Sequence, residues 1–170
     1  MLKNTLLSTA LVALAAAAAT ASGGLSAPAG PPASEGGASR AYLHSYNVPG
    51  HGVALEGYSP VSYFEGQAER GSALFAVEHD GLTYHLTDAA QARKFAGSPA
   101  KYLPAYGGWC AFGMAVKDKF PIDPTLFKIV DGRLLLFLRN AGVDARELWD
   151  NGEERQLLHD ADAHWGKVQG

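Results

Sequence analysis

Cysteine is nearly absent from this sequence, since the 170 residues include one, Cys110. A single cysteine excludes an intramolecular disulfide and any Cys-x-x-Cys motif. Phosphate-binding loops, dinucleotide-binding glycine patterns, Gly-x-Ser-x-Gly and His-Glu-x-x-His are missing too, so the common enzyme templates do not apply. The net charge is only −3 and no basic run is present, which argues against a nucleic-acid partner.

The first 40 residues contain two segments that we expect to lie outside the folded domain. Residues 1–21 combine a lysine near the start, an apolar run and a final Ala-Thr-Ala, which is typical of a secretory signal peptide. Residues 22–40 are dominated by Gly, Pro, Ala and Ser, which predicts a disordered linker. The folded domain is therefore expected over 41–170, in a periplasmic or secreted protein with no membrane span after signal cleavage.

Two stretches of the expected domain have the pattern of a β-hairpin. Residues 75–86 and residues 126–138 each place Asp-Gly between two largely apolar runs, and Asp-Gly is a strong signal for a two-residue turn. In the first hairpin the alternation puts His85 on the face away from the core. The sequence predicts an α+β fold in which a small antiparallel sheet, built from the two hairpins, is covered by helices. Helices are expected near 88–96, 109–116, 143–150 and 153–167.

Residues 102–112 form the most unusual run in the chain. They hold the single cysteine, four aromatic residues and the adjacent glycines Gly107 and Gly108. Glycine tolerates positive φ and allows close approaches that a Cβ would block. We therefore expect at least one of these two glycines to have a positive φ or a close backbone contact.

Cys110 and Met114 raise the question of a soft-metal site. Their spacing of four residues would place a thiol and a thioether on one face of a helix. Cu(I) favours Cys, Met and His, and His44, His51 or His85 could complete such a site. The alternative is core packing, because Cys and Met are ordinary buried residues. A third interpretation, a thiol-dependent enzyme, needs an exposed and electropositive thiolate.

Two runs carry a family resemblance. Residues 57–64 (Gly-Tyr-Ser-Pro-Val-Ser-Tyr-Phe) and 106–111 (Tyr-Gly-Gly-Trp-Cys-Ala) resemble the exported YHS-domain proteins of bacteria, and the resemblance extends over about residues 53–165. It implies metal binding, because the name-giving module is similar to small modules of heavy-metal transport proteins. Two departures weaken that implication. Ser59 stands where the family commonly has Asp, and residues 84–91 lack the cysteines of the metal-binding modules.

The residues and the resemblance together predict a periplasmic, non-catalytic binding module that binds a soft metal such as copper through Cys110. The alternative is a structural or protein-interaction domain in which Cys110 is core packing. The partner is expected to be a metal ion, a small ligand or another protein. The expected metal ligands are Cys110, Met114, His85 and His51. The residues expected to contact a cofactor or partner are Tyr58, Tyr106, Gly107, Gly108 and Trp109.

Overall fold

The structure, a computed structural model, describes residues 45–48 and 52–170. The predicted signal peptide and linker, together with His51, lie outside these residues. Helices and antiparallel strand pairs both occur over the described chain, so the predicted α+β class is confirmed. None of the helices in this part of the chain combines the length and the apolar content that crossing a membrane requires.

The first half of the described chain contains one hairpin with short helical elements before and after it. Its elements, in order, are the 3-10 turn η1 (Ala54–Gly57), α2 (Pro60–Phe64), β1 (Ser72–His79), β2 (Leu82–Leu86), α3 (Ala89–Gly97) and α4 (Pro99–Tyr102). Asp80 and Gly81 connect the strands with φ of 49° and 75°. Two successive positive φ values are what a tight turn matching the twist of the strands needs.

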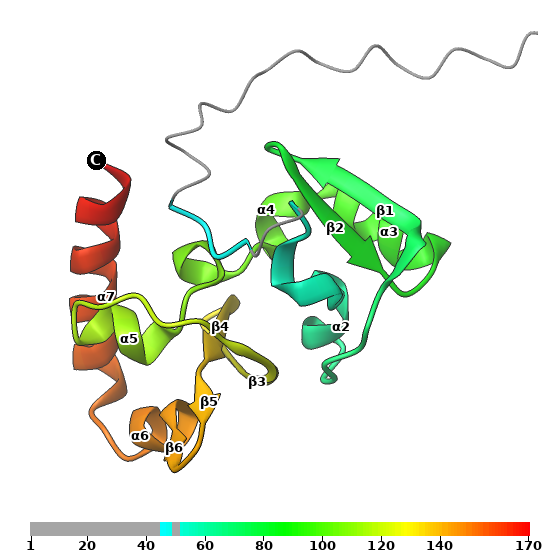
Figure 1. The fold of residues 1–170 in the computed structure, drawn as a ribbon. Helices are drawn as coiled ribbons and strands as arrows, with labels where there is room; N and C mark the ends of the chain where they lie inside the picture. Colours follow the sequence, from blue (N-terminus) through cyan, green and yellow to red (C-terminus); the bar gives the residue numbers. More distant parts are fainter. Residues whose placement is uncertain (1–44, 49–51) are drawn as a thin grey trace, which may run out of the picture. The chain divides into compact units, whose positions relative to one another are not determined.

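The second half contains the other predicted hairpin and the two longest C-terminal helices. Its elements are the 3-10 turn η2 (Ala105–Gly108), α5 (Ala111–Ala115), β3 (Asp123–Val130), β4 (Arg133–Phe137), β5 (Arg139–Asn140), β6 (Val143–Asp144), α6 (Ala145–Asp150) and α7 (Glu154–Gln169). Figure 1 shows α5 lying alongside α7, and the residue contacts agree.

The two hairpins form separate two-stranded sheets, so the structure differs from the prediction of a sheet built from both (Figure 1). In each hairpin the second strand, β2 or β4, forms bridges with a segment from the same half of the chain. Val53 bridges Thr83 in β2, and Pro104 and Cys110 bridge β4. These segments occupy part of one edge of each hairpin, and the two hairpins do not pair with each other.

The two halves repeat one structural unit. Adding 51 to each bound of η1, α2, β1 and β2 gives the bounds of η2, α5, β3 and β4 (105 − 54 = 51 and 137 − 86 = 51, for example). We call residues 53–86 the first repeat and residues 104–137 the second repeat. The bridge from Val53 to Thr83 likewise corresponds to the bridge from Pro104 to Leu134.

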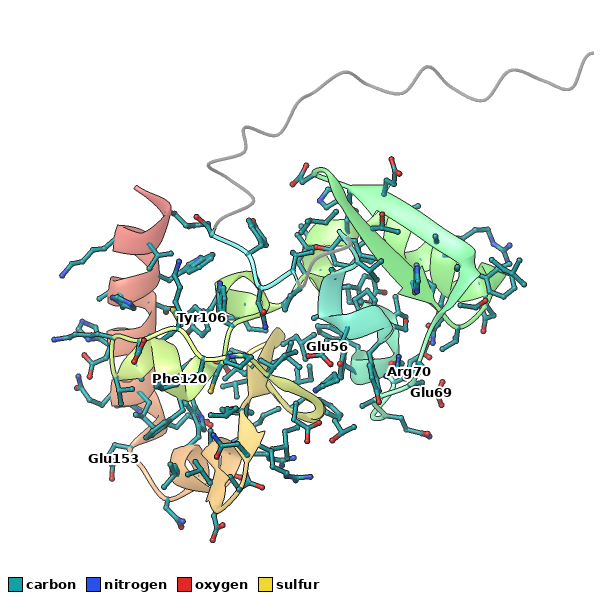
Figure 2. All side chains as sticks on the ribbon, in the orientation of Figure 1. Glu56, Glu69, Arg70, Tyr106, Phe120 and Glu153 are labelled. Carbon is teal, nitrogen blue, oxygen red and sulfur yellow. The ribbon has the colours of Figure 1, made fainter. Side chains whose placement is uncertain are left out.

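The repeat extends to backbone hydrogen bonds and to irregularities in the strands. The amide of Ser59 donates to the carbonyl oxygen of Glu69 (2.8 Å), and the equivalent amide of Cys110 donates to that of Phe120 (3.1 Å). Glu69 and Phe120 are both labelled in Figure 2. The register shift after Ser72 in β1 also recurs after Asp123 in β3. The two halves therefore share one backbone design.

Few side chains are shared between the repeats, which explains why the sequence indicated only the likeness of the hairpins. Ala54 and Gly57 match Ala105 and Gly108, and the Asp-Gly turns match each other. At most other positions the residue types differ, as where Ser59 corresponds to Cys110. The repeat is thus visible in the backbone and hardly visible in the sequence.

The four longer predicted helices are confirmed as α3, α5, α6 and α7. Two of them begin with an aspartate that caps the helix. Oδ1 of Asp88 accepts hydrogen bonds from the amides of Ala90 and Gln91 at the start of α3. Oδ1 of Asp144 accepts from the corresponding amides at the start of α6. These carboxylates satisfy amides that have no partner within the helix.

Candidate functional site

Cys110 has a buried thiol that is held by hydrogen bonds from the backbone. The residue immediately precedes α5 and is 0% exposed. Its Sγ accepts hydrogen bonds from the amides of Gly113 (3.4 Å) and Leu138 (3.3 Å). Burial raises the pKa of the Cys110 thiol, so the neutral form is favoured. This arrangement is the opposite of the exposed, electropositive thiolate that a nucleophile needs.

Met114 lies near Cys110 along the chain, and His85 takes part in none of the hydrogen bonds or bridges of Cys110 within the described residues. Met114 lies one helical turn after Cys110, is buried, and its amide donates to the Cys110 carbonyl oxygen (2.9 Å). His85 lies in the first repeat. The backbone of His85 lies so close to Gly71 that a Cβ on this glycine would overlap it, and the His85 Nδ1 lies near Gly57. The hydrogen bonds and the bridge of Cys110 join it to α5, to Phe120 before β3, to Leu136 in β4 and to Leu138 directly after β4.

His51 lies outside the described residues, so its relation to Cys110 stays a prediction. Within residues 45–48 and 52–170, no group of three or more His, Cys, Asp and Glu side chains is arranged to hold a metal ion. Cys110 therefore stands among backbone amides and apolar side chains of the core.

A pocket of about 290 Å³ lies beside η2, and two of the predicted contact residues, Tyr106 and Gly107, line it. The chain brings its walls together from four separate segments: the stretch before residue 49, the region from α4 to η2, the turn into β4, and the end of α7. The side chains that matter most for its chemistry are those of Tyr46, Lys101, Tyr106, Arg133 and Trp165.

The other predicted contact residues lie outside the pocket lining. Gly108 and Trp109 directly follow Gly107 and hold the segment 45–48 in place. The carbonyl oxygen of Gly108 accepts from Nδ2 of Asn47 (3.0 Å), and Nε1 of Trp109 donates to the carbonyl oxygen of Ser45 (2.8 Å). Tyr58 lies in the first repeat, where Arg70 stacks over its ring at 5.0 Å.

The turn that carries the pocket has a left-handed backbone. Tyr106, Gly107 and Gly108 have φ of 56°, 59° and 82°, so the prediction of positive φ at these glycines is confirmed. The equivalent residues Leu55, Glu56 and Gly57 have φ of 55°, 52° and 82°. Since Glu56 adopts this conformation with a full side chain, positive φ alone does not explain glycine at the equivalent position 107.

Close packing explains Gly107. A Cβ there would lie 2.8 Å from Cη2 of Trp165, 3.0 Å from the carbonyl oxygen of Ser45 and 3.1 Å from the Tyr46 ring. These distances leave no room for even one methyl group. Gly107 thus allows α7 and the segment 45–48 to meet over the turn, and this meeting forms the aromatic part of the pocket wall.

A hydrogen-bonded network fixes the polar side of the pocket. Tyr106 donates its hydroxyl hydrogen to Oδ1 of Asp162 in α7 (2.9 Å), and Nη2 of Arg133 donates to the Tyr106 hydroxyl oxygen (3.1 Å). Arg133 also donates to both carboxylate oxygens of Asp162 (2.6 and 3.0 Å). Figure 2 shows Tyr106 beside α7.

The network holds each of its groups in one protonation state. Burial raises the pKa of Tyr106, which keeps its hydroxyl neutral and able to donate. The hydrogen bonds from Arg133 lower the pKa of Asp162, which keeps the carboxyl ionised. The arrangement is a preformed wall and contains no activated nucleophile.

Lys101 supplies a second positive charge at the pocket. Its Nζ lies 5.2 Å from the centre of the Tyr102 ring, and no carboxylate within the described chain pairs with it. Among the described lining residues, Lys101 and Arg133 are cationic and none is acidic. Sequence reasoning missed Tyr46, Lys101, Arg133 and Trp165, because their spacing along the chain gives no signal that they meet.

Comparisons with protein-family models, curated proteins and solved structures found no match to this chain. The resemblance to exported YHS-domain proteins therefore stays a prediction that rests on the sequence runs around Tyr58 and Tyr106.

Proposed function

We propose that the folded part of this chain is a non-catalytic binding module, and that its site is the pocket beside Tyr106 and Gly107. The observation that carries this proposal is the comparison of the two repeats. Where the second repeat has Tyr106, Gly107 and Arg133, the first has Leu55, Glu56 and Leu82. Both repeats nevertheless build the same turn and the same hairpin.

The shared scaffold thus does not require the residues that line the pocket. Leu55 and Leu82 occupy the positions equivalent to Tyr106 and Arg133, and both are buried apolar residues, 3% and 2% exposed. Arg133 instead brings a charge to a half-buried position, where it needs Asp162 and Tyr106 to satisfy it. A polar network that the scaffold can be built without is best explained by the binding of a ligand.

The burial and hydrogen bonding of Cys110 support a role in packing, which was the alternative predicted from the sequence. The binding of copper through Cys110, which is expected from the sequence, has a direct test. The purified protein and its Cys110→Ser variant would compete with a chromogenic chelator for Cu(I) under reducing conditions. We expect equal and weak competition from both, whereas tight binding lost in the variant would overturn the packing role.

We retain the sequence-based prediction that the protein is exported, which would place the pocket in the periplasm or outside the cell. The Tyr106, Arg133 and Asp162 side chains of the network form a wall with fixed protonation, so binding without turnover is the function that this geometry supports best.

A ligand screen tests the proposed function. Small flat molecules would be added to isotope-labelled protein, and the amide signals would be followed by NMR. We expect hits to shift the amides of Gly107 and Gly132, which line the pocket. The variant Tyr106→Leu with Arg133→Leu copies the residues of the first repeat and should lose these hits. The control variant Lys119→Gln changes an exposed lysine outside the pocket and should keep them.

Two outcomes would overturn the proposal. One is that the screen yields no molecule that shifts these amides in the parent protein. The other is that every hit binds the parent and the double variant equally. If the double variant does not fold, the map of shifted amides in the parent protein still decides the question.

A further inference from the structure

We infer that the pocket beside Tyr106 binds a small organic anion with a flat apolar body. This inference rests on the proposed function and specifies its ligand class. It comes from three features of the pocket: the arrangement of its aromatic rings, the balance of its charges, and its size.

The aromatic rings provide a surface for the flat body of the ligand. Trp165 meets Tyr46 edge to face, with ring centres 6.2 Å apart and planes at 87°. It meets Tyr106 in a similar way, at 6.4 Å and 76°. The three rings therefore form a rigid corner around Gly107. Aromatic walls of this kind bind flat apolar groups through stacking and edge contacts.

The charges around the corner favour a negative group on the ligand. Lys101 has no carboxylate partner within the described chain, so its charge is free to attract an anion. The charge of Arg133 is largely balanced by Asp162, but an arginine has five N–H donors. Three hydrogen bonds to Asp162 and Tyr106 leave further donors of Arg133 for the ligand.

One feature opposes an anion and so indicates its position. Helix α7 ends at Gln169, which lines the pocket, and the carbonyl end of a helix carries partial negative charge. The negative group of the ligand is therefore expected on the side of Lys101 and Arg133. The apolar body then lies towards Trp165 and the end of α7.

The size of the pocket limits the ligand to a small molecule. A volume of about 290 Å³ is at the lower end of the range for ligand pockets. One or two fused rings with a short acidic arm match this volume, and a longer ligand would extend beyond the pocket.

The test uses three molecules that share an indole ring and differ in the charge of the arm: indoleacetate, indoleacetamide and tryptamine. Each is titrated into isotope-labelled protein, and the affinity is taken from the shifts of the Gly107 and Gly132 amides. We expect indoleacetate to bind about three- to fivefold more tightly than the neutral amide, as for a partly exposed ion pair. Tryptamine, which is cationic, should bind most weakly.

Matched lysine variants identify the source of the preference. Lys101→Gln should remove most of the advantage of indoleacetate and leave indoleacetamide unchanged. Lys119→Gln is the control, because Lys119 is also an exposed lysine over an aromatic ring, 5.7 Å from the centre of Trp109, and lies outside the pocket. It should change neither affinity.

The possible failures can be distinguished. If indoleacetamide or tryptamine binds as tightly as indoleacetate, the inference of an anionic ligand is overturned and the pocket remains a binding site. If none of the three shifts these amides at millimolar concentration, the inference is overturned for this class of ligand, and the broader screen described above decides the proposed function separately.

Discussion

Ser59 and Cys110 occupy equivalent positions in the two repeats and are held there in the same way. Each precedes a short helix, and each amide donates to a carbonyl oxygen in the segment leading to the hairpin, that of Glu69 or Phe120. Their side chains differ in partner. The Ser59 hydroxyl donates to Oε1 of Gln91 (2.6 Å), whereas the Cys110 sulfur accepts from backbone amides. This position of the repeat thus accommodates either a serine or a cysteine side chain.

The first prediction concerns the pH dependence that Cys110 gives to stability. Burial raises the pKa of the Cys110 thiol in the folded protein. The contribution of the thiol to the free energy of unfolding is therefore fully present below the ordinary thiol pKa of about 8.5. This contribution is lost as the pH rises towards the folded-state pKa, because the unfolded chain ionises first. The advantage of the parent protein over Cys110→Ser should therefore shrink between pH 7 and pH 10.

Urea denaturation at several pH values measures this difference, since both proteins share every other titrating group. Equal slopes of unfolding free energy against pH would contradict it. A second measurement uses a chromogenic disulfide reagent at pH 8. Cys110 should react slowly in the native protein and rapidly in urea, and rapid reaction of the native protein would show that the thiol is exposed.

The second prediction concerns the glycine pair. Gly107→Ala should destabilise the protein by about 1–3 kcal/mol, because its Cβ would overlap Trp165 and Ser45. Gly108→Ala has room for its Cβ, with the nearest atom 3.8 Å away, but must keep φ near 82°. It should cost about 1 kcal/mol from the left-handed backbone alone.

Gly97→Ala is the matched control, because Gly97 ends α3 and its Cβ would meet nothing within 4 Å. This variant should be neutral or up to about 1 kcal/mol more stable. Chemical denaturation of the three variants gives the order. If Gly107→Ala were no less stable than Gly97→Ala, the close approach of Trp165 would not be the reason for glycine at 107.

The third prediction concerns the two capping aspartates. Hydrogen bonds from backbone amides, chiefly that of Gln91 for Asp88 and that of Glu147 for Asp144, lower the pKa of each carboxyl. Because these folded-state pKa values are depressed, the stabilisation is present above the ordinary aspartate pKa of about 3.9. It is lost as the pH falls through the folded-state pKa values.

Asp88→Ala and Asp144→Ala should therefore both lower the melting temperature at pH 7. The differences from the parent protein should narrow as the pH falls towards 2, because a growing share of the two carboxyl groups is protonated. Thermal unfolding followed by circular dichroism at both pH values checks this. A difference that is as large at pH 2 as at pH 7 would mean that the aspartates act through packing and not as charged caps.

Local signals predicted much of the fold. Asp80-Gly81 and Asp131-Gly132 located both hairpins, and the helices expected near 88–96, 143–150 and 153–167 correspond to α3, α6 and α7. The aspartates that cap α3 and α6 were not among the predicted features. The separation of the sheets could not be predicted in this way. Val53 and Pro104 bridge to β2 and β4 where the other hairpin was expected, and neither residue carries a sequence signal for such pairing.

The candidate site was predicted only in part, because its residues come from distant segments. Tyr106 and Gly107 stood out through local composition. Tyr46 and Lys101 are unremarkable in their own segments, and Trp165 lies in an expected helix whose sequence gives no sign that it meets Tyr46 and Tyr106. The suggested meeting of His85 with Cys110 had no geometric basis in the sequence, and the structure assigns their described contacts to different repeats.

The offset of 51 residues allows this chain to be compared with itself. Aligning the chain with its own shifted copy separates two kinds of position. Gly57 and Gly108, like the paired Asp-Gly turns, are identical in the two repeats and have positive φ in both. Leu55 and Tyr106 differ although their backbone conformation is the same. A position whose residue differs while its backbone does not is one that the fold leaves open, and in the second repeat this position lines the pocket.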